Sequence, residues 1–166
     1  MISSEQLLAR ARTAFRSQPL PTPFFWTALE EPLEGDIPEE LGERIAGRPW
    51  TEITILDWLM IGAPPFVSRR YLEPSTFIYY LPSLLIGALN EMRYIQFALE
   101  GIIPHNKTHT PGGPWWNAFS ENISIEQRRV ILFFLTVVRQ NFWNEIGDIN
   151  LYYLSVAEDI WSEGNS

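Results

Sequence analysis

The fold class is decided by the stretch Ser124-Ile125-Glu126-Gln127-Arg128-Arg129-Val130-Ile131-Leu132-Phe133-Phe134-Leu135-Thr136-Val137-Val138. Ser124 followed three residues later by Gln127 is typical of the capping box that opens a helix. From Val130 to Val138 nearly every residue is apolar, so a helix built from them has no clear polar face. The stretch therefore predicts a near-fully apolar central helix over about residues 124–146.

On the C-terminal side of this stretch, Gly147 ends the central helix and Asp148 can cap a last one. Apolar residues then recur at helical spacing, and this predicts a buried stripe. The stripe comprises Ile149, Tyr152, Tyr153, Val156 and Ile160.

On the N-terminal side, four more helices are expected. The first is opened by Ser3 and Gln6 and ends before Pro19, and a short one covers residues 39–46. Thr51 is the expected N-cap of a helix over residues 52–61, although the β-branched residues there also fit a strand. Pro82 is best placed at the first position of a helix that runs to about Glu100; the alternative is one kinked helix from Ser75 onward.

No partner strands with period-two alternation accompany these segments, so we predict an all-α fold. A chain of 166 residues can support one core. We expect a compact single domain, residues 1–166, of about five to six helices with long proline-rich loops. These loops are an irregular acidic wrap over residues 19–49 and a Pro/Gly/His loop over residues 103–117.

Negative charge is concentrated in two segments. Residues 28–43 contain seven carboxylates and no basic residue, and residues 144–166 contain five and none, in a chain of net charge −8. An acidic patch steers toward basic partners and repels polyanions. The candidate partner-binding residues of the first segment are Glu30, Glu31, Glu34, Asp36, Glu39, Glu40 and Glu43.

Several classes of protein lack their usual signals in this sequence. Cysteine is absent, which excludes disulfides and thiolate sites. There is no nucleophile elbow and no glycine-rich phosphate loop, so no catalytic residue is assigned and no cofactor is expected. Neither a secretory signal nor a run long enough to span a bilayer is visible, and a cytoplasmic setting without membrane contact is the expectation.

His105 and His109 are spaced i, i+4, as in zinc-binding helices. Pro104 and the run Pro111-Gly112-Gly113-Pro114 place them in a loop without a third ligand nearby, so no metal site is predicted. Trp115 and Trp116 follow this loop, and such a pair is either core or an anchor for a protein partner. The basic residues form no stripe, and nucleic-acid binding is therefore not expected.

The stretch Phe77-Ile78-Tyr79-Tyr80-Leu81-Pro82, preceded by Glu73-Pro74-Ser75, resembles the signature of an uncharacterised bacterial family of unknown function. In that family a phenylalanine, a tyrosine pair and Leu-Pro open a helix. Ala14-Phe15 and the following Pro19-Leu20-Pro21 resemble its N-terminal end. The resemblance implies a small helical bacterial protein and transfers no catalytic residue.

Three functional hypotheses follow. The leading one is a non-enzymatic partner-binding protein, in its most concrete form an immunity or antidote protein that neutralises a basic toxin through the acidic surface. The second is an enzyme or small-ligand protein that uses the His105/His109 loop as a lid over an aromatic pocket. The third is a structural or self-associating subunit.

Overall fold

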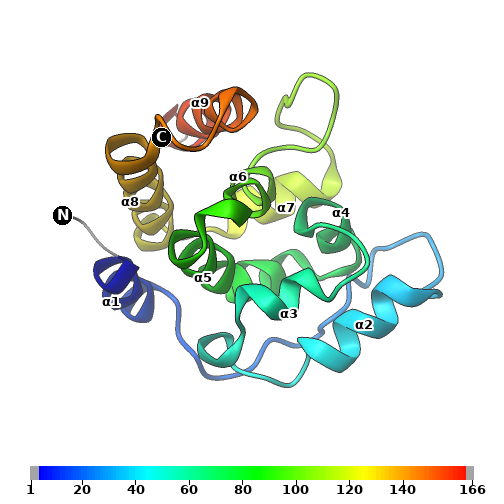
Figure 1. Cartoon of the computed structure of the whole chain (residues 1–166). Helices are drawn as coiled ribbons and strands as arrows, with labels where there is room; N and C mark the ends of the chain where they lie inside the picture. Colours follow the sequence, from blue (N-terminus) through cyan, green and yellow to red (C-terminus); the bar gives the residue numbers. More distant parts are fainter. Residues whose placement is uncertain (1–3, 164–166) are drawn as a thin grey trace.

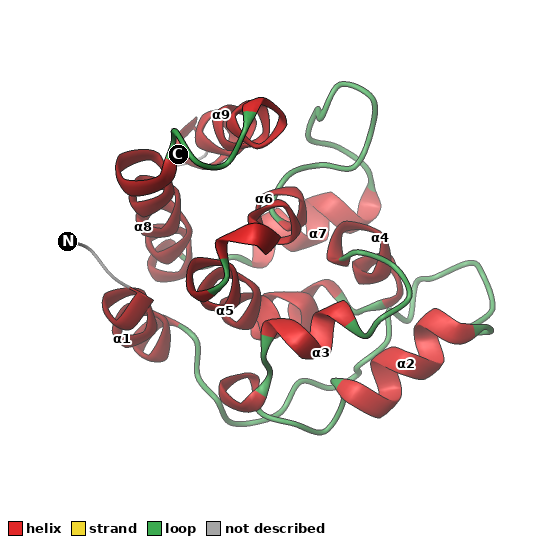
Figure 2. Cartoon of the chain, in the orientation of Figure 1, coloured by secondary structure: helices red, strands yellow, loops and turns green. Residues whose placement is uncertain are grey.

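The computed structural model describes residues 4–163, and within this range the chain is all-helical, with nine α-helices and no β-strand (Figure 2). The predicted fold class is confirmed. The helices are more numerous than the expected five to six because several short ones lie in segments where proline and glycine limit helix length. They are α1 (Ser4–Ala14), α2 (Asp36–Arg44), α3 (Ile55–Leu59), α4 (Pro65–Ser68), α5 (Pro74–Asn90), α6 (Ile95–Gly101), α7 (Pro114–Asn122), α8 (Ile125–Phe142) and α9 (Asp148–Glu163).

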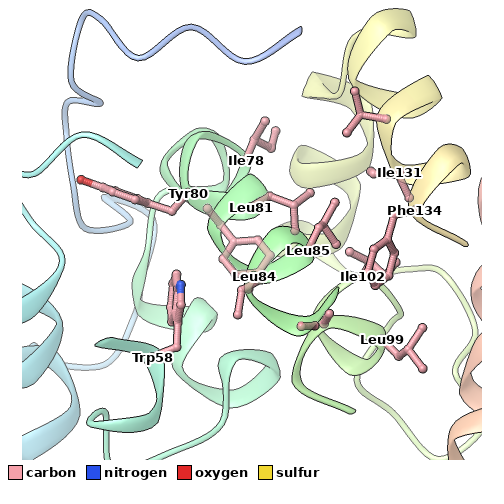
Figure 3. Close-up of a cluster of buried hydrophobic side chains, with 14 of the residues drawn as sticks. Trp58, Ile78, Tyr80, Leu81, Leu84, Leu85, Leu99, Ile102, Ile131 and Phe134 are labelled. Atoms are coloured by element: carbon pink, nitrogen blue, oxygen red, sulfur yellow. The ribbon is translucent and has the colours of Figure 1, made fainter. Parts of the chain in front are cut away.

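Helix α5 lies at the centre of the molecule, and the other long helices surround it (Figure 1). It contacts α1, α3, α6, α7 and α8. Figure 3 shows Leu81, Leu84 and Leu85 of α5 directed toward side chains of the neighbouring helices. All three are fully buried, so α5 forms the axis of the hydrophobic core.

Pro82 lies inside α5 rather than at its start, so the kinked-helix alternative describes this segment and the preferred reading was wrong. The helix also ends at Asn90, well before Glu100. The turn beside Pro82 gains support from side chains, because Ser83 Oγ donates to the Tyr80 carbonyl oxygen at 2.5 Å and accepts from Trp58 Nε1 at 2.8 Å. Because the buried polar atoms of Ser83 and Trp58 are hydrogen-bonded, their burial in the core is not unfavourable.

The helix predicted as central is α8, and it lies at one side of the molecule between α1 and α9 (Figure 1). Its capping box is confirmed: Gln127 N–H donates to Ser124 Oγ at 3.1 Å. Phe133, on its outer side, is covered by the Arg10 guanidinium of α1, 4.0 Å from the ring centroid. Over its whole length α8 also has polar residues that remain exposed, among them Glu126, Arg129 and Gln140, and this explains how the helix occupies a peripheral position.

Backbone hydrogen bonds hold the wrap that precedes α2 against the middle of the chain. Trp26 N–H donates to the Tyr71 carbonyl at 2.9 Å, and Glu73 N–H donates to the Phe24 carbonyl at 3.1 Å. Between the two, Phe25 and Leu72 form an isolated antiparallel bridge. The wrap is therefore irregular, as predicted, and Phe24 and Phe25 within it pack against the core.

Several predicted helix boundaries are wrong. Thr51 is not the N-cap of α3, because it lies in a 3₁₀ turn, Trp50–Glu52, and α3 begins four residues later at Ile55. Helix α2 begins at Asp36, before the predicted residue 39. Ser3, predicted to cap the first helix, lies outside the described residues.

Among residues 4–163, no helix combines the length and the apolar character that crossing a membrane would require.

Candidate functional site

The acidic segment folds into an exposed loop, residues 28–35, followed by α2 at one edge of the molecule (Figure 1). Asp36, Glu39, Glu40 and Glu43 follow the pattern i, i+3, i+4, i+7, which places four carboxylates on one face of α2. Pro38 and Leu41 are buried on the opposite face. The helix therefore presents a continuous acidic stripe to solvent.

Six of the seven predicted carboxylates are exposed, and Glu40 is half-buried. Glu40 Oε1 accepts a hydrogen bond from Gly62 N–H at 3.1 Å. Within the described range only Glu31 has a basic partner, Arg70, at the long distance of 3.6 Å between two exposed side chains. Arginines thus leave nearly all of this negative charge uncompensated.

A cavity of about 750 Å³ lies next to the acidic loop. It is bounded by the wrap before α2, by α4, by the loop after α6 and by the first turn of α7. Its apolar walls include Trp26, Phe66 and Trp115. Trp115 and Trp116 belong to α7 rather than to the loop, because Pro114 occupies the first helical position and the loop predicted over residues 103–117 ends at residue 113.

Arg69 forms part of the cavity wall and is only 4% exposed. Its Nη1 and Nη2 donate to the carbonyl oxygens of Gly101 and Ile103 at 2.6 and 2.9 Å. The guanidinium also lies 4.9 Å from the centroid of the Trp115 ring. No carboxylate of the described chain forms an ion pair with it. Burial lowers the pKa of Arg69 to about 9, and the negative charge of Glu100 counters part of this effect.

The two loop histidines contact different parts of the molecule. The His105 ring packs 4.5 Å from Phe66 at the cavity, whereas His109 lies 5.8 and 5.6 Å from the rings of Tyr152 and Tyr153 in α9. Burial lowers the pKa of His105, and the positive charge of Arg69 lowers it further. The histidines therefore do not converge on one ligand. In residues 4–163 no group of three or more metal-ligating side chains is found.

The structure brings together two features that the sequence analysis treated separately. Glu30 and Glu31 of the acidic loop and the pair Trp115 and Trp116 line the same cavity. Asp36 and the acidic residues after it do not line it. Sequence reasoning missed the role of Arg69. Arg69 is buried against the ring of Trp115, which follows 46 residues later in the chain. No local sequence pattern predicts a contact between residues so far apart.

A model of a family of unknown function (DUF6714) matches residues 3–163 of the chain. No curated protein and no solved structure gives a match. The family match agrees with the resemblance noted in the sequence, and it brings no established activity with it.

Proposed function

This chain belongs to the DUF6714 family, whose function is unknown, and from the arrangement of its surface charge we propose that it is a non-enzymatic protein that binds a basic protein partner. The observation that carries the proposal is the acidic stripe of α2 together with the loop before it. All of these carboxylates except the half-buried Glu40 are exposed, and only Glu31 has a basic partner in the described structure. A patch of one sign raises the rate of encounter with an oppositely charged partner and disfavours partners of like charge.

The geometry favours a preorganised surface. Leu41 and Ile45 are fully buried, which anchors α2 on the core and fixes the direction of its acidic face. Tyr80 Oη also donates to the Arg48 carbonyl oxygen at 2.7 Å and lies 3.1 Å from the Ile45 carbonyl oxygen, just beyond the end of α2. A surface that is already ordered loses less conformational entropy on binding than a flexible one.

The most specific form of the proposal is an immunity or antidote protein whose partner is a basic toxin that acts on nucleic acid. Side chains three and four residues apart on a helix have Cβ atoms about 5–6 Å apart. Carboxylates at such short, regular intervals resemble the repeated negative charge of a phosphate backbone. A stripe of this kind can cover a site that normally binds nucleic acid.

The test compares two variants with the same change in net charge. In the first, called the stripe variant, four exposed carboxylates of the acidic loop and of the α2 stripe are neutralised by the substitutions Glu34→Gln, Asp36→Asn, Glu39→Gln and Glu43→Gln. In the matched control, exposed acids elsewhere are neutralised by Glu121→Gln, Glu126→Gln, Glu145→Gln and Asp159→Asn. Binding to the product of the neighbouring gene, tested as the candidate partner, is measured by surface plasmon resonance at low and at physiological salt.

We expect the stripe variant to lose at least about tenfold in association rate at low salt, and the control to lose less than about threefold. The dependence of the association rate on salt should weaken only in the stripe variant, because screening acts on the charges that steer the encounter. Equal losses in both variants would show that net charge alone is responsible and would remove the stripe as the binding site.

The cavity supports a second candidate function, the binding of a small ligand. The observation in its favour is the buried Arg69 in an aromatic wall.

A further inference from the structure

The cavity beside α4 is lined by charges of both signs: the buried Arg69, the exposed Glu30, and the exposed pair Glu31 and Arg70, whose side chains approach to 3.6 Å. Arg69, 4% exposed, has carbonyl oxygens and aromatic rings as neighbours but no ion-pair partner in the described chain. A buried charge without an opposite charge is unfavourable, and an anion in the cavity would offset it. Glu30 and Glu31 belong to the acidic loop, line the same cavity and are exposed.

The N-terminus of α7 also borders the cavity. Gly113, Pro114 and Trp115 all line it, and the N-cap Gly113 offers no side-chain acceptor. The N–H groups of the first helical turn therefore have no side-chain cap, and they carry the positive end of the helix dipole. α7 has nine residues and thus adds a second source of positive potential that is independent of the Arg69 charge.

The remaining walls are apolar. Trp26, Phe66 and Trp115 are half-buried, so their rings are partly available to a ligand. The volume of about 750 Å³ falls within the range of about 300–1,000 Å³ that is typical of small-molecule sites. This size and lining suit an organic molecule with an apolar body rather than a bare inorganic ion.

We propose that this cavity binds a small monocarboxylate with an apolar or aromatic body. Its carboxylate lies near the Arg69 guanidinium and the first turn of α7, and its body packs between Trp26, Phe66 and Trp115. Both terminal nitrogens of Arg69 already donate to backbone carbonyls, so the guanidinium attracts the carboxylate through its charge, and the uncapped N–H groups of the first turn of α7 supply hydrogen bonds. Glu30, which is exposed in the lining and has no ion-pair partner in the described chain, repels a second negative charge on a ligand, so the site discriminates against dicarboxylates and phosphate dianions.

The test uses 3-phenylpropionate as the probe and the indole N–H signals of the seven tryptophans as the readout, in a ¹⁵N-labelled full-length chain. The signals of Trp26, Trp115 and Trp116 should shift on titration, while that of Trp143, which is exposed and does not line the cavity, should not. A dissociation constant of about 1 mM is the order expected for a ligand of this size. Succinate and inorganic phosphate are titrated in parallel.

Two variants test whether the carboxylate of the probe binds beside Arg69 and the first turn of α7. Arg69→Met removes the charge and keeps the length of the side chain. Pro114→Glu places a competing carboxylate at the first helical position, where an acidic residue favours the helix, so this variant remains informative if the first does not fold. Arg93→Met is the matched control, because Arg93 is exposed and lies outside the cavity.

We expect folded Arg69→Met and Pro114→Glu proteins to bind the probe at least about tenfold more weakly than the parent chain, and Arg93→Met to bind it within about twofold. Unchanged binding in Pro114→Glu, or tighter binding of succinate or phosphate than of 3-phenylpropionate, would overturn the proposal. So would the absence of shifts at all three cavity tryptophans up to about 10 mM probe, well above the expected dissociation constant. The quadruple neutralisation of Glu34, Asp36, Glu39 and Glu43 should leave probe binding unchanged, so this result is independent of the proposed protein partner.

Discussion

At the scale of single residues, Gly87 shows how closely the central helix approaches its neighbours. A Cβ atom built at this position would lie 2.9 Å from the Cβ of Ile55 and 3.3 Å from its backbone nitrogen. Backbone and a β-branched side chain have little room to move away. Glycine therefore lies inside a helix, where its intrinsic propensity is poor, because α5 and α3 pack too closely for any side chain.

Gly87→Ala should thus destabilise the protein, although alanine is the better helix former. We expect a loss of about 1–3 kcal/mol from overpacking, measured as the change in the free energy of unfolding by urea titration. The matched control is Gly42→Ala in α2, where the nearest atom to a new Cβ is Phe25 Cζ at 4.0 Å. That substitution should stabilise by about 0.5–1 kcal/mol. A stabilising Gly87→Ala would show that the contact between α5 and α3 is looser than described.

At the scale of elements, the start of α3 depends on one carboxylate. Asp57 Oδ2 accepts hydrogen bonds from the N–H and the hydroxyl of Thr54 at 2.8 and 3.2 Å, and Oδ1 accepts from Arg48 at 3.0 Å. Burial of Asp57 acts to raise its pKa, but these hydrogen bonds and the Arg48 charge together lower it below the usual 3.8. The ionised carboxylate thereby joins α3 to the segment that follows α2.

Because the pKa of Asp57 is lower in the folded state than in the unfolded state, its ionised form stabilises the fold above about pH 4, and this contribution is lost as the pH falls through the folded-state pKa. Asp57→Asn should lower the free energy of unfolding by about 1 kcal/mol at pH 7 and by progressively less below pH 4. Denaturant titrations across this pH range measure the difference. Glu126→Gln, at an exposed position in the first turn of α8, serves as the control. A deficit in Asp57→Asn that does not change with pH would contradict the role assigned to the charge.

At the scale of the whole molecule, long-range hydrogen bonds join the two ends of the chain to its middle. Trp161 Nε1 in α9 donates to the Ile102 carbonyl oxygen at 2.7 Å, and Trp50 Nε1 donates to the Phe15 carbonyl oxygen at 3.1 Å. One cluster of buried residues extends from Leu7 in α1 to Trp161 in α9. No part of the described chain has a separate core.

We therefore expect the chain to unfold as a single domain. Differential scanning calorimetry should show one transition whose calorimetric and van't Hoff enthalpies agree, with an enthalpy of about 0.7 kcal/mol per residue near 60 °C. Circular dichroism and tryptophan fluorescence should report the same midpoint. Two resolved transitions, or a calorimetric enthalpy well above the van't Hoff value, would contradict the single-domain prediction.

Local sequence determined the helical class of this protein, the capping box of α8, the irregular wrap and the concentration of acid in one exposed segment. These properties depend on neighbouring residues, on helical periodicity and on turn chemistry, all of which act over a few positions. The acidic stripe of α2 belongs to this group, because its spacing is visible in the sequence once the helix begins at Asp36.

Tertiary structure alone decided which helix is central and where the cavity forms. Pro82 is tolerated inside α5 because the surrounding core, including Trp58 through Ser83, supports the interrupted turn. Arg69 becomes a buried cation only because carbonyls at the end of α6 and just after it, and the rings of α7, pack against it. Contacts between residues far apart in sequence set burial and electrostatic environment, and no local pattern encodes them.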